Sequence, residues 1–287
     1  MKLKQYKEIV YEWSGLVFVF LVLFLYAISP NGKHLTQVFF DGIRITPERQ
    51  EVAIVGIDDA SLRALGAWPW NRSVFAELTK KLDEYGVKAI AYDVLFLEQR
   101  EGDVQFRDVL SKVHTKIIFG SKIEHATYIE SFFVDKNNGH LSSALANVLP
   151  DVDGKVRVYP KPFLDGVSCV RGLGEQAFRV ATFKADDTDC GQADSIYFRY
   201  PEHITKYSVQ DILSGTISSE LLKGKVVFVG STALDLEDHF VGMNGEKIPG
   251  VEVHASIFTS LMNHEGDKNL SVVSIFCLLL VITILVL

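Results

Sequence analysis

The sequence contains no run of lysines or arginines, and its acidic residues outnumber its basic ones. It has 36 Asp and Glu against 29 Lys and Arg, which gives a net charge of −7 at pH 7. Binding to a nucleic-acid backbone depends on clustered positive charge. The composition therefore argues against a nucleic-acid-binding protein, and we expect no nucleic acid among its partners.

The sequence also lacks the short motifs of the common enzyme classes. There is no phosphate-binding P-loop, no nucleophile elbow and no HExxH zinc motif. Residues 172–177 (GLGEQA) fit the dinucleotide fingerprint, but the acidic residue expected at the end of the following strand is missing. We therefore predict no catalytic residue and no cofactor, and leave the metal content open.

Cysteine is scarce, with three residues in the whole chain. Cys277 lies in an apolar C-terminal run, where a thiol serves as a small apolar side chain. Cys169 and Cys190 lie in the central part, and they could form a disulfide in an oxidising compartment or remain two buried thiols. We favour the disulfide, because Cys190 lies in a polar loop rather than in a core-like segment.

Long apolar runs occur only at the two ends of the chain. Residues 13–29 and 270–287 carry no charged side chain, and each is close to the lower limit of roughly 17 residues for a membrane-spanning helix. The first run could instead be a cleaved signal peptide, since Ala27 and Ser29 form a small-x-small site. We favour an uncleaved anchor because Pro30 follows that site directly.

The charges that flank the first apolar run predict the orientation of the chain. Lys2, Lys4 and Lys7 precede it, so residues 1–12 are expected in the cytoplasm. Residues 30–269 would then be extracytoplasmic, in the periplasm or outside the cell, and residues 270–287 would return the chain into the inner membrane. Because the sequence ends inside this second span, we expect a truncated chain.

The pattern between the two apolar ends predicts one α/β domain with a mostly parallel central sheet and flanking helices. Val52–Ile57 and Val87–Val94 are apolar runs typical of buried strands, and the helix-like segment 72–85, which Asn71 is placed to cap, separates them. A strand, a helix and a strand with short turns form a right-handed βαβ unit. Strand 225–229 and a helix after Pro249-Gly250 complete the expected frame.

The remaining segments are less regular, and their expected structures are as follows. Helices are expected at 101–113, 141–149, 175–183 and 209–213, the last one capped by Ser208. Strands are expected at 116–120, 128–134, 163–170 and 196–200, and the alternating residues 156–159 indicate an antiparallel piece or an insertion on the sheet.

Three aspartates are expected at the carboxyl ends of the parallel strands, where ligands bind in open α/β sheets. These are Asp58, Asp93 and Asp238, and together they could bind a divalent cation or a cationic ligand. The alternative is that each aspartate caps a neighbouring helix or turn. The other candidates for the site are Trp68, Trp70, Arg72 and His254, although a lone histidine on an apolar helix face is more often a core residue.

Five segments in one order resemble the type-two CHASE extracellular sensor domain. They are IVGIDDASLRALGAWPWNR, AIAYDVLF, DVDGKVRVYP, KVVFVGSTALDLED and PGVEVHASIFTSL, and the similarity covers roughly residues 35 to 265. The positions that match the family pattern are Asp58, Gly66, Trp68-Pro69-Trp70, Arg72, Asp93, Asp153-Gly154, Arg157, Gly230, Asp238, Pro249-Gly250 and His254.

The resemblance implies the sensory half of a bacterial transmembrane receptor, expected as a homodimer. A small ligand, an ion or a periplasmic protein would act as the stimulus, and a cyclase or kinase output absent from this chain would receive the signal. It implies no catalytic residue. Two other functions stay open: a membrane-anchored metal-assisted enzyme that uses Asp58, Asp93, Asp238 and His254, and a membrane-anchored interaction domain without a small ligand.

Overall fold

The computed structural model describes residues 51–263, with internal gaps at 135–138, 152, 160, 167, 184–189, 191–197, 199, 202, 237 and 243–244. The two expected membrane segments, 13–29 and 270–287, lie outside the described residues. None of the helices that can be described is long and apolar enough to cross a membrane.

A seven-stranded sheet forms the centre of the domain. Its strands are β1 (Val52–Ile57), β2 (Ala89–Leu95), β3 (Lys116–Glu124), β4 (Thr127–Ile129), β5 (Leu141–Leu145), β8 (Lys206–Ser208) and β9 (Val226–Ser231). Six of them run parallel in the order β8-β1-β9-β2-β3-β5, and β4 pairs antiparallel with the end of β3. The predicted fold class, α/β with a mostly parallel sheet and flanking helices, is confirmed.

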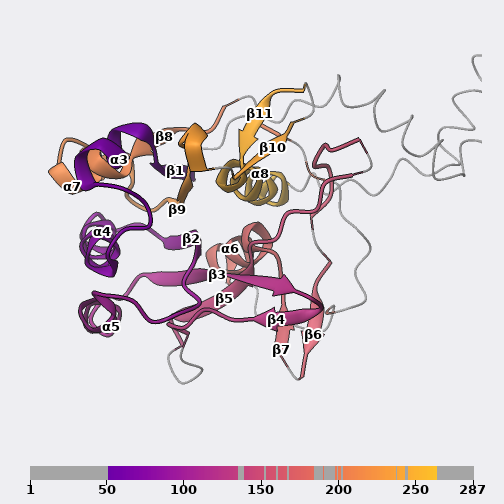
Figure 1. Ribbon diagram of the computed structural model, residues 1–287, viewed down its shortest axis with the longest axis horizontal. Coiled ribbons are helices and arrows are strands. Elements are labelled where there is room, and N and C mark those ends of the chain that lie inside the picture. The colour runs from indigo at the N-terminus through magenta and orange to yellow at the C-terminus, as the bar shows by residue number, and fades with distance from the viewer. Residues whose placement is uncertain are drawn as a thin grey trace, which may run out of the picture. The chain divides into compact units, whose positions relative to one another are not determined.

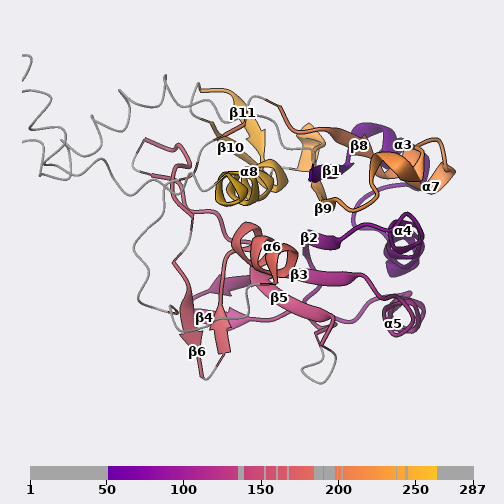
Figure 2. The same ribbon diagram turned by 180° about the vertical axis from the view of Figure 1, so that it is seen from behind.

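Helices cover both faces of the sheet. On one face lie α3 (Asp59–Leu65), α4 (Arg72–Glu84), α5 (Asp103–Leu110) and α7 (Val209–Ser214), and on the other lie α6 (Leu173–Thr182) and α8 (Gly250–Met262) (Figures 1 and 2). Two hairpins add to this frame: β6 (Phe163–Asp165) with β7 (Ser168–Val170), and β10 (His239–Val241) with β11 (Lys247–Pro249). Short 3-10 turns occupy Ser219–Leu221 and Leu234–Leu236.

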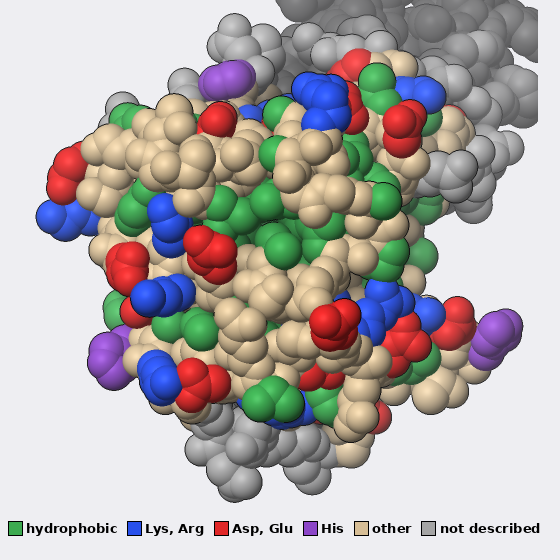
Figure 3. All heavy atoms as spheres, turned by 60° about the vertical axis from the view of Figure 1, so that its left-hand side comes forward, with side chains coloured by type: hydrophobic (Ala, Val, Ile, Leu, Met, Phe, Trp, Pro, Cys, Tyr) green, Lys and Arg blue, Asp and Glu red, His purple; other side chains and the backbone are tan. Residues whose placement is uncertain are grey.

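Surface charge on the face that carries α3, α4, α5 and α7 is mixed. Acidic and basic side chains alternate across it, and hydrophobic side chains gather in a hollow near its middle (Figure 3). No positive patch of the kind that binds nucleic acid is seen on this face.

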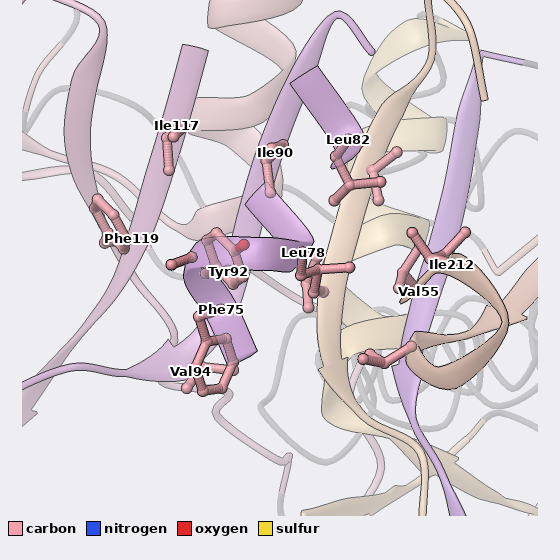
Figure 4. Packing of buried hydrophobic residues seen from close by; sticks show 14 of the residues in the cluster. Val55, Phe75, Leu78, Leu82, Ile90, Tyr92, Val94, Ile117, Phe119 and Ile212 are labelled. Atoms are coloured by element: carbon pink, nitrogen blue, oxygen red, sulfur yellow. The ribbon is translucent and has the colours of Figure 1, made fainter. Parts of the chain in front are cut away.

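The core on the α4 side of the sheet is aromatic. Phe75 of α4 is fully buried, and its ring lies 5.1 Å from that of Phe96 and 6.0 Å from that of Tyr92 (centroid distances). Tyr92 and Phe75 lie at the centre of the cluster between Phe119 and Val55 (Figure 4). This packing fixes α4 against β2, and α4 is the helix that begins beside the strand ends.

A hydrogen bond between two buried hydroxyl groups also connects α4 to β2. The Thr79 hydroxyl donates to the Phe75 carbonyl at 2.6 Å, so the Tyr92 hydroxyl is the donor in its 2.7 Å hydrogen bond to Thr79. Burial raises the pKa of Tyr92, and this phenol therefore stays neutral.

The predicted helix at 141–149 is wrong, because residues 141–145 form β5, which pairs in parallel with β3. The spacing of Leu141 and Leu145 fits one helix face, but the free main-chain groups of β3 at the sheet edge determine the structure instead. The predicted strand at 163–170 is a hairpin with its turn at Gly166. Of the predicted strand 128–134, only residues 128 and 129 lie in a strand, β4.

The expected antiparallel piece at 156–159 is not a strand. The buried Arg157 instead donates two hydrogen bonds, each 2.7 Å long, to the Asp153 carboxylate, and this fork closes the preceding turn. Most of the predicted strand 196–200 lies outside the described residues, and its described members, Phe198 and Tyr200, are not in a strand.

Cys169 of β7 and Cys190 are joined by a disulfide, with their sulfur atoms 2.03 Å apart. The two cysteines are 21 positions apart, so the bond ties the β6–β7 hairpin to the segment that follows α6.

The aromatic core should carry a large share of the stability. We expect Phe75→Ala to lower the free energy of unfolding by about 3–5 kcal/mol, because it empties a fully buried aromatic site. Val104→Ala in α5, where the side chain is 85 % exposed, should change it by less than about 0.5 kcal/mol. Urea denaturation of both variants measures the difference, and equal stabilities would contradict this account of the core.

Candidate functional site

A cavity of about 310 Å³ opens at the carboxyl ends of β1, β2 and β9. This is where ligands bind in open α/β sheets, and the size lies at the lower end of the range for small-molecule sites. The residues that line it are Ile57, Trp68, Pro69, Arg72, Asp93, Val94, Leu95, Arg100, Ser231, Leu236 and Asp238.

Two glycines allow the acidic side of the cavity to form. Gly230 of β9 pairs with Asp93 of β2, and a Cβ at position 230 would come within 3.0 Å of the Asp93 Cβ and 2.8 Å of the Val251 Cβ. At position 250, the first residue of α8, a Cβ would lie 2.6 Å from an Asp238 carboxylate oxygen. Larger residues at these positions would separate the sheet end, the Asp238 loop and α8.

The Trp68-Pro69-Trp70 segment forms an aromatic wall with two different functions. Trp70 is in the core, 3 % exposed, and its indole N–H donates to the Gly66 carbonyl at 2.8 Å. The Trp68 ring contacts Trp70 and Phe75 edge to face, with centroids 5.5 and 6.1 Å apart, and also lines the cavity. The peptide bond between Trp68 and Pro69 is cis. Trp68 is therefore the tryptophan that a ligand would contact, and Trp70 anchors it.

Arg72 enters the cavity from the first turn of α4. Asn71 caps this helix by accepting a hydrogen bond from the Ser73 N–H at 2.9 Å, as the sequence predicts. The Arg72 guanidinium lies 4.5 Å from the centroid of the Phe96 ring, and its Nε lies 3.6 Å from Asp103 Oδ1. Burial, with the nearby Arg100, lowers the pKa of Arg72, although a guanidinium keeps its charge in proteins.

Asp93 and Asp238 form a carboxyl pair in the cavity lining. The side chain of Asp93 is 8 % exposed, and its Oδ2 has no hydrogen-bond partner among the described residues. Burial, with a smaller contribution from the neighbouring Asp238, raises the pKa of Asp93 well above its ordinary value. Burial also raises the pKa of Asp238. Two carboxyls that lie close together and away from water favour holding a proton.

His254 of α8 lies behind Asp93 and does not line the cavity. Its Nε2 is 3.6 Å from Asp93 Oδ1 and 3.2 Å from the Ala146 carbonyl. A carbonyl can only accept, so Nε2 carries the ring proton. Burial lowers the pKa of His254 to about 4, so the ring is neutral at pH 7 and does not compensate the charge of the carboxyl pair.

Asp58 does not line the cavity, so the expectation that it joins Asp93 and Asp238 there is corrected. It caps α3 instead: its Oδ1 accepts hydrogen bonds from the Ser61 N–H at 2.8 Å and from the Ser208 hydroxyl at 2.9 Å. Burial alone would raise the pKa of Asp58, but the bonds from Ser61 and Ser208 outweigh it, and the pKa lies below its ordinary value. For Asp58 the capping alternative is therefore the one that the structure shows.

The cavity also contains residues that the sequence did not single out. Ser231 follows Gly230 at the end of β9, and its hydroxyl is buried without a hydrogen-bond partner in the described part of the chain. Its position directly after an apolar strand run was the available signal. Arg100 lies in an irregular loop, and no pattern in the sequence indicates that it reaches the cavity.

No set of three or more His, Cys, Asp or Glu side chains is placed to hold a metal ion within the described ranges. The cavity lining supplies two carboxyls and one serine hydroxyl. This is a small donor set for a hard cation, which usually takes six or more oxygen ligands.

The family model described as CHASE2 domain matches residues 16–287 of the chain. No curated protein and no solved structure matches it.

The neutral buried His254 predicts a loss of stability in acid. Its pKa is lowered in the folded state. Its contribution to the stability of the folded state is therefore complete above about pH 6.5 and is lost as the pH falls through about 4. Between pH 7 and 4, the free energy of unfolding of the protein should fall by on the order of 3 kcal/mol more than that of a His254→Gln variant. The amide of this variant can still donate to the Ala146 carbonyl.

Urea titrations at several pH values test this expectation. His203→Gln, at an exposed position, is the matched control and should follow the unaltered protein at every pH. Parallel pH profiles for the unaltered protein and the His254→Gln variant would show that the histidine is not held neutral.

Proposed function

The chain belongs to the CHASE2 domain family, and on this premise we propose that it is the extracytoplasmic sensory domain of a bacterial membrane receptor. Its role is signal input rather than catalysis. The cavity at the strand ends receives the stimulus, and a cytoplasmic cyclase or kinase receives the signal. A homodimer is the expected working unit.

One observation supports this role most strongly: the cavity contains buried polar groups that have no hydrogen-bond partner in the described part of the chain. Asp93 Oδ2 and the Ser231 hydroxyl are both buried, lack hydrogen bonds within the described residues and lie at the cavity. An unsatisfied buried polar group costs about 1–3 kcal/mol. A fold that keeps two of them at one cavity is suited to bind a ligand that satisfies them.

The proposed signal path starts at the contact between Asp238 and α8. The Asp238 carbonyl accepts a hydrogen bond from the Gly250 N–H at 3.0 Å, and the Asp238 carboxylate lies against the same glycine. In the sequence, α8 leads to the second expected span, residues 270–287. A ligand that draws the Asp238 loop into the cavity would therefore act on the start of α8.

A ligand can shift such a receptor only by binding one of its two states more tightly. In the state with the ligand bound, the Asp238 carboxylate faces the ligand. In the ligand-free state it rests against Gly250. The first span, residues 13–29, and the second span are both connected to this one domain. A displacement of α8 relative to β1 would therefore displace one span relative to the other in the bilayer.

The relay can be tested without knowing the ligand. The full chain is fused in frame at Leu287 to a histidine-kinase output, and the basal reporter signal is measured in cells. We expect Gly250→Ala to change this signal at least about fivefold, the lower range of allosteric coupling, because the added Cβ would displace the Asp238 carboxylate.

Gly139→Ala is the matched control, since a Cβ there has no neighbour within 4 Å, and its signal should equal that of the unaltered fusion. Equal signals from all three fusions, at equal membrane levels, would contradict the proposed path through Asp238 and α8.

A further inference from the structure

Three hydrogen-bond acceptors line the cavity. They are Asp93 Oδ2 and the Ser231 hydroxyl, both buried and unpartnered within the described chain, and the carboxylate of Asp238. Asp93 is the last residue of β2 that pairs with β9, at Gly230, and Ser231 follows that glycine. Strand register therefore brings Asp93 and Ser231 to the same end of the sheet.

His239, which directly follows Asp238, tends to lower the pKa of Asp238, but burial outweighs this effect. His254 approaches Asp93 from α8 but is neutral, and Asp238 approaches it from the segment before β10. The two arginines of the lining have acidic partners elsewhere: Arg72 lies 3.6 Å from Asp103, and Arg100 pairs with Glu98. The two carboxyls thus share the cavity with two arginines that lie next to other carboxylates.

We propose that the cavity binds a small organic ammonium ion, whose N–H groups donate to Asp93, Asp238 and Ser231 and whose apolar body contacts Trp68. The proposal rests on the proposed sensory function and names the chemical class of the stimulus. A primary ammonium has three donors and no acceptor, and the cavity lining supplies three acceptors.

The lining favours an organic ammonium ion over a metal ion. The two carboxyls and one hydroxyl provide few ligands for a divalent cation, and no larger set of acidic, histidine or cysteine side chains is found in the part of the chain that the structure describes. Apart from Arg72 and Arg100, the rest of the wall is apolar or aromatic, with Ile57, Val94 and Leu95 from the strand ends and Leu236 from the loop. Trp68 adds an indole ring, the side chain that attracts cations most strongly.

The buried carboxyl pair gives this binding a pH signature. In the ligand-free protein Asp93 keeps its proton at pH values above those at which an ordinary aspartate ionises, because burial and the neighbouring Asp238 raise its pKa. A bound ammonium stabilises the ionised carboxylate, so binding releases a proton. Affinity should then rise up to about tenfold per pH unit until the pH passes the raised pKa.

The experiment measures binding to the full chain, purified in detergent, by isothermal titration calorimetry between pH 5 and 8. The probes are isobutylamine and phenethylamine, each with its matched alcohol and its matched carboxylate. We expect the amines to bind and the alcohols and carboxylates to bind at least about tenfold more weakly. Amine affinity should rise with pH.

Single substitutions locate the site. Asp93→Asn and Asp238→Asn should each weaken amine binding at least about tenfold, and Ser231→Ala should weaken it less. Asp235→Asn, at an exposed position in the same loop, and Asp58→Asn, which keeps a good helix cap, are the matched controls and should bind like the unaltered protein. Thermal melts establish that each variant is folded.

Three results would overturn the proposal. These are carboxylates or alcohols that bind as well as the amines, amine binding that survives both Asp93→Asn and Asp238→Asn, and Mg²⁺ or Ca²⁺ that binds this site while the amines do not. Failure of the sensory function is a separate result. It would appear as amines that bind while Gly250→Ala leaves the output of the fusion unchanged.

Discussion

The organisation of this domain depends on one buried carboxyl group. Asp93 stands at the end of a central strand with its side chain 8 % exposed, next to a second carboxyl and in front of a neutral histidine. Burying an uncompensated carboxylate is costly, so the group holds its proton in the free protein. The glycines at 230 and 250 bring the sheet end, the Asp238 loop and α8 close enough together to create this pair.

The surrounding core provides the stability that such a site requires. β1, β2 and β9 are almost wholly apolar, and the aromatic cluster around Phe75 fixes α4 to β2. Trp70 belongs to that cluster and supports Trp68 at the cavity. The rigid aromatic wall and the polar strand ends thus belong to one packed unit. In the proposed mechanism, the loop of Asp238 is the part that moves when a ligand binds.

The frame of the fold could be predicted because its strands and helices have clear periodicity. Apolar β-branched runs identified β1 and β9, and Ser208 and Asn71 marked the starts of α7 and α4. The strand β5 could not be predicted, because its two leucines are four residues apart and only the pairing with β3 determines its structure.

The site was only partly predictable for a different reason. The rule that ligands bind at strand ends placed Asp93 and Asp238 at one edge, and both line the cavity. The direction in which a side chain points depends on neighbours distant in the sequence. Ser208, at the start of α7, donates a hydrogen bond to Asp58, the Phe75 cluster buries Trp70, and the Ala146 carbonyl keeps His254 behind Asp93.

The most direct test of the account is the titration of Asp93 itself. Carbon-13 NMR of the aspartate carboxyl groups, with Asp93→Asn used to assign the signal, measures its pKa in the folded chain. The account predicts that Asp93 stays protonated well above the range of an ordinary aspartate. Titration near pH 4, together with the exposed aspartates, would contradict a buried carboxyl pair at the cavity.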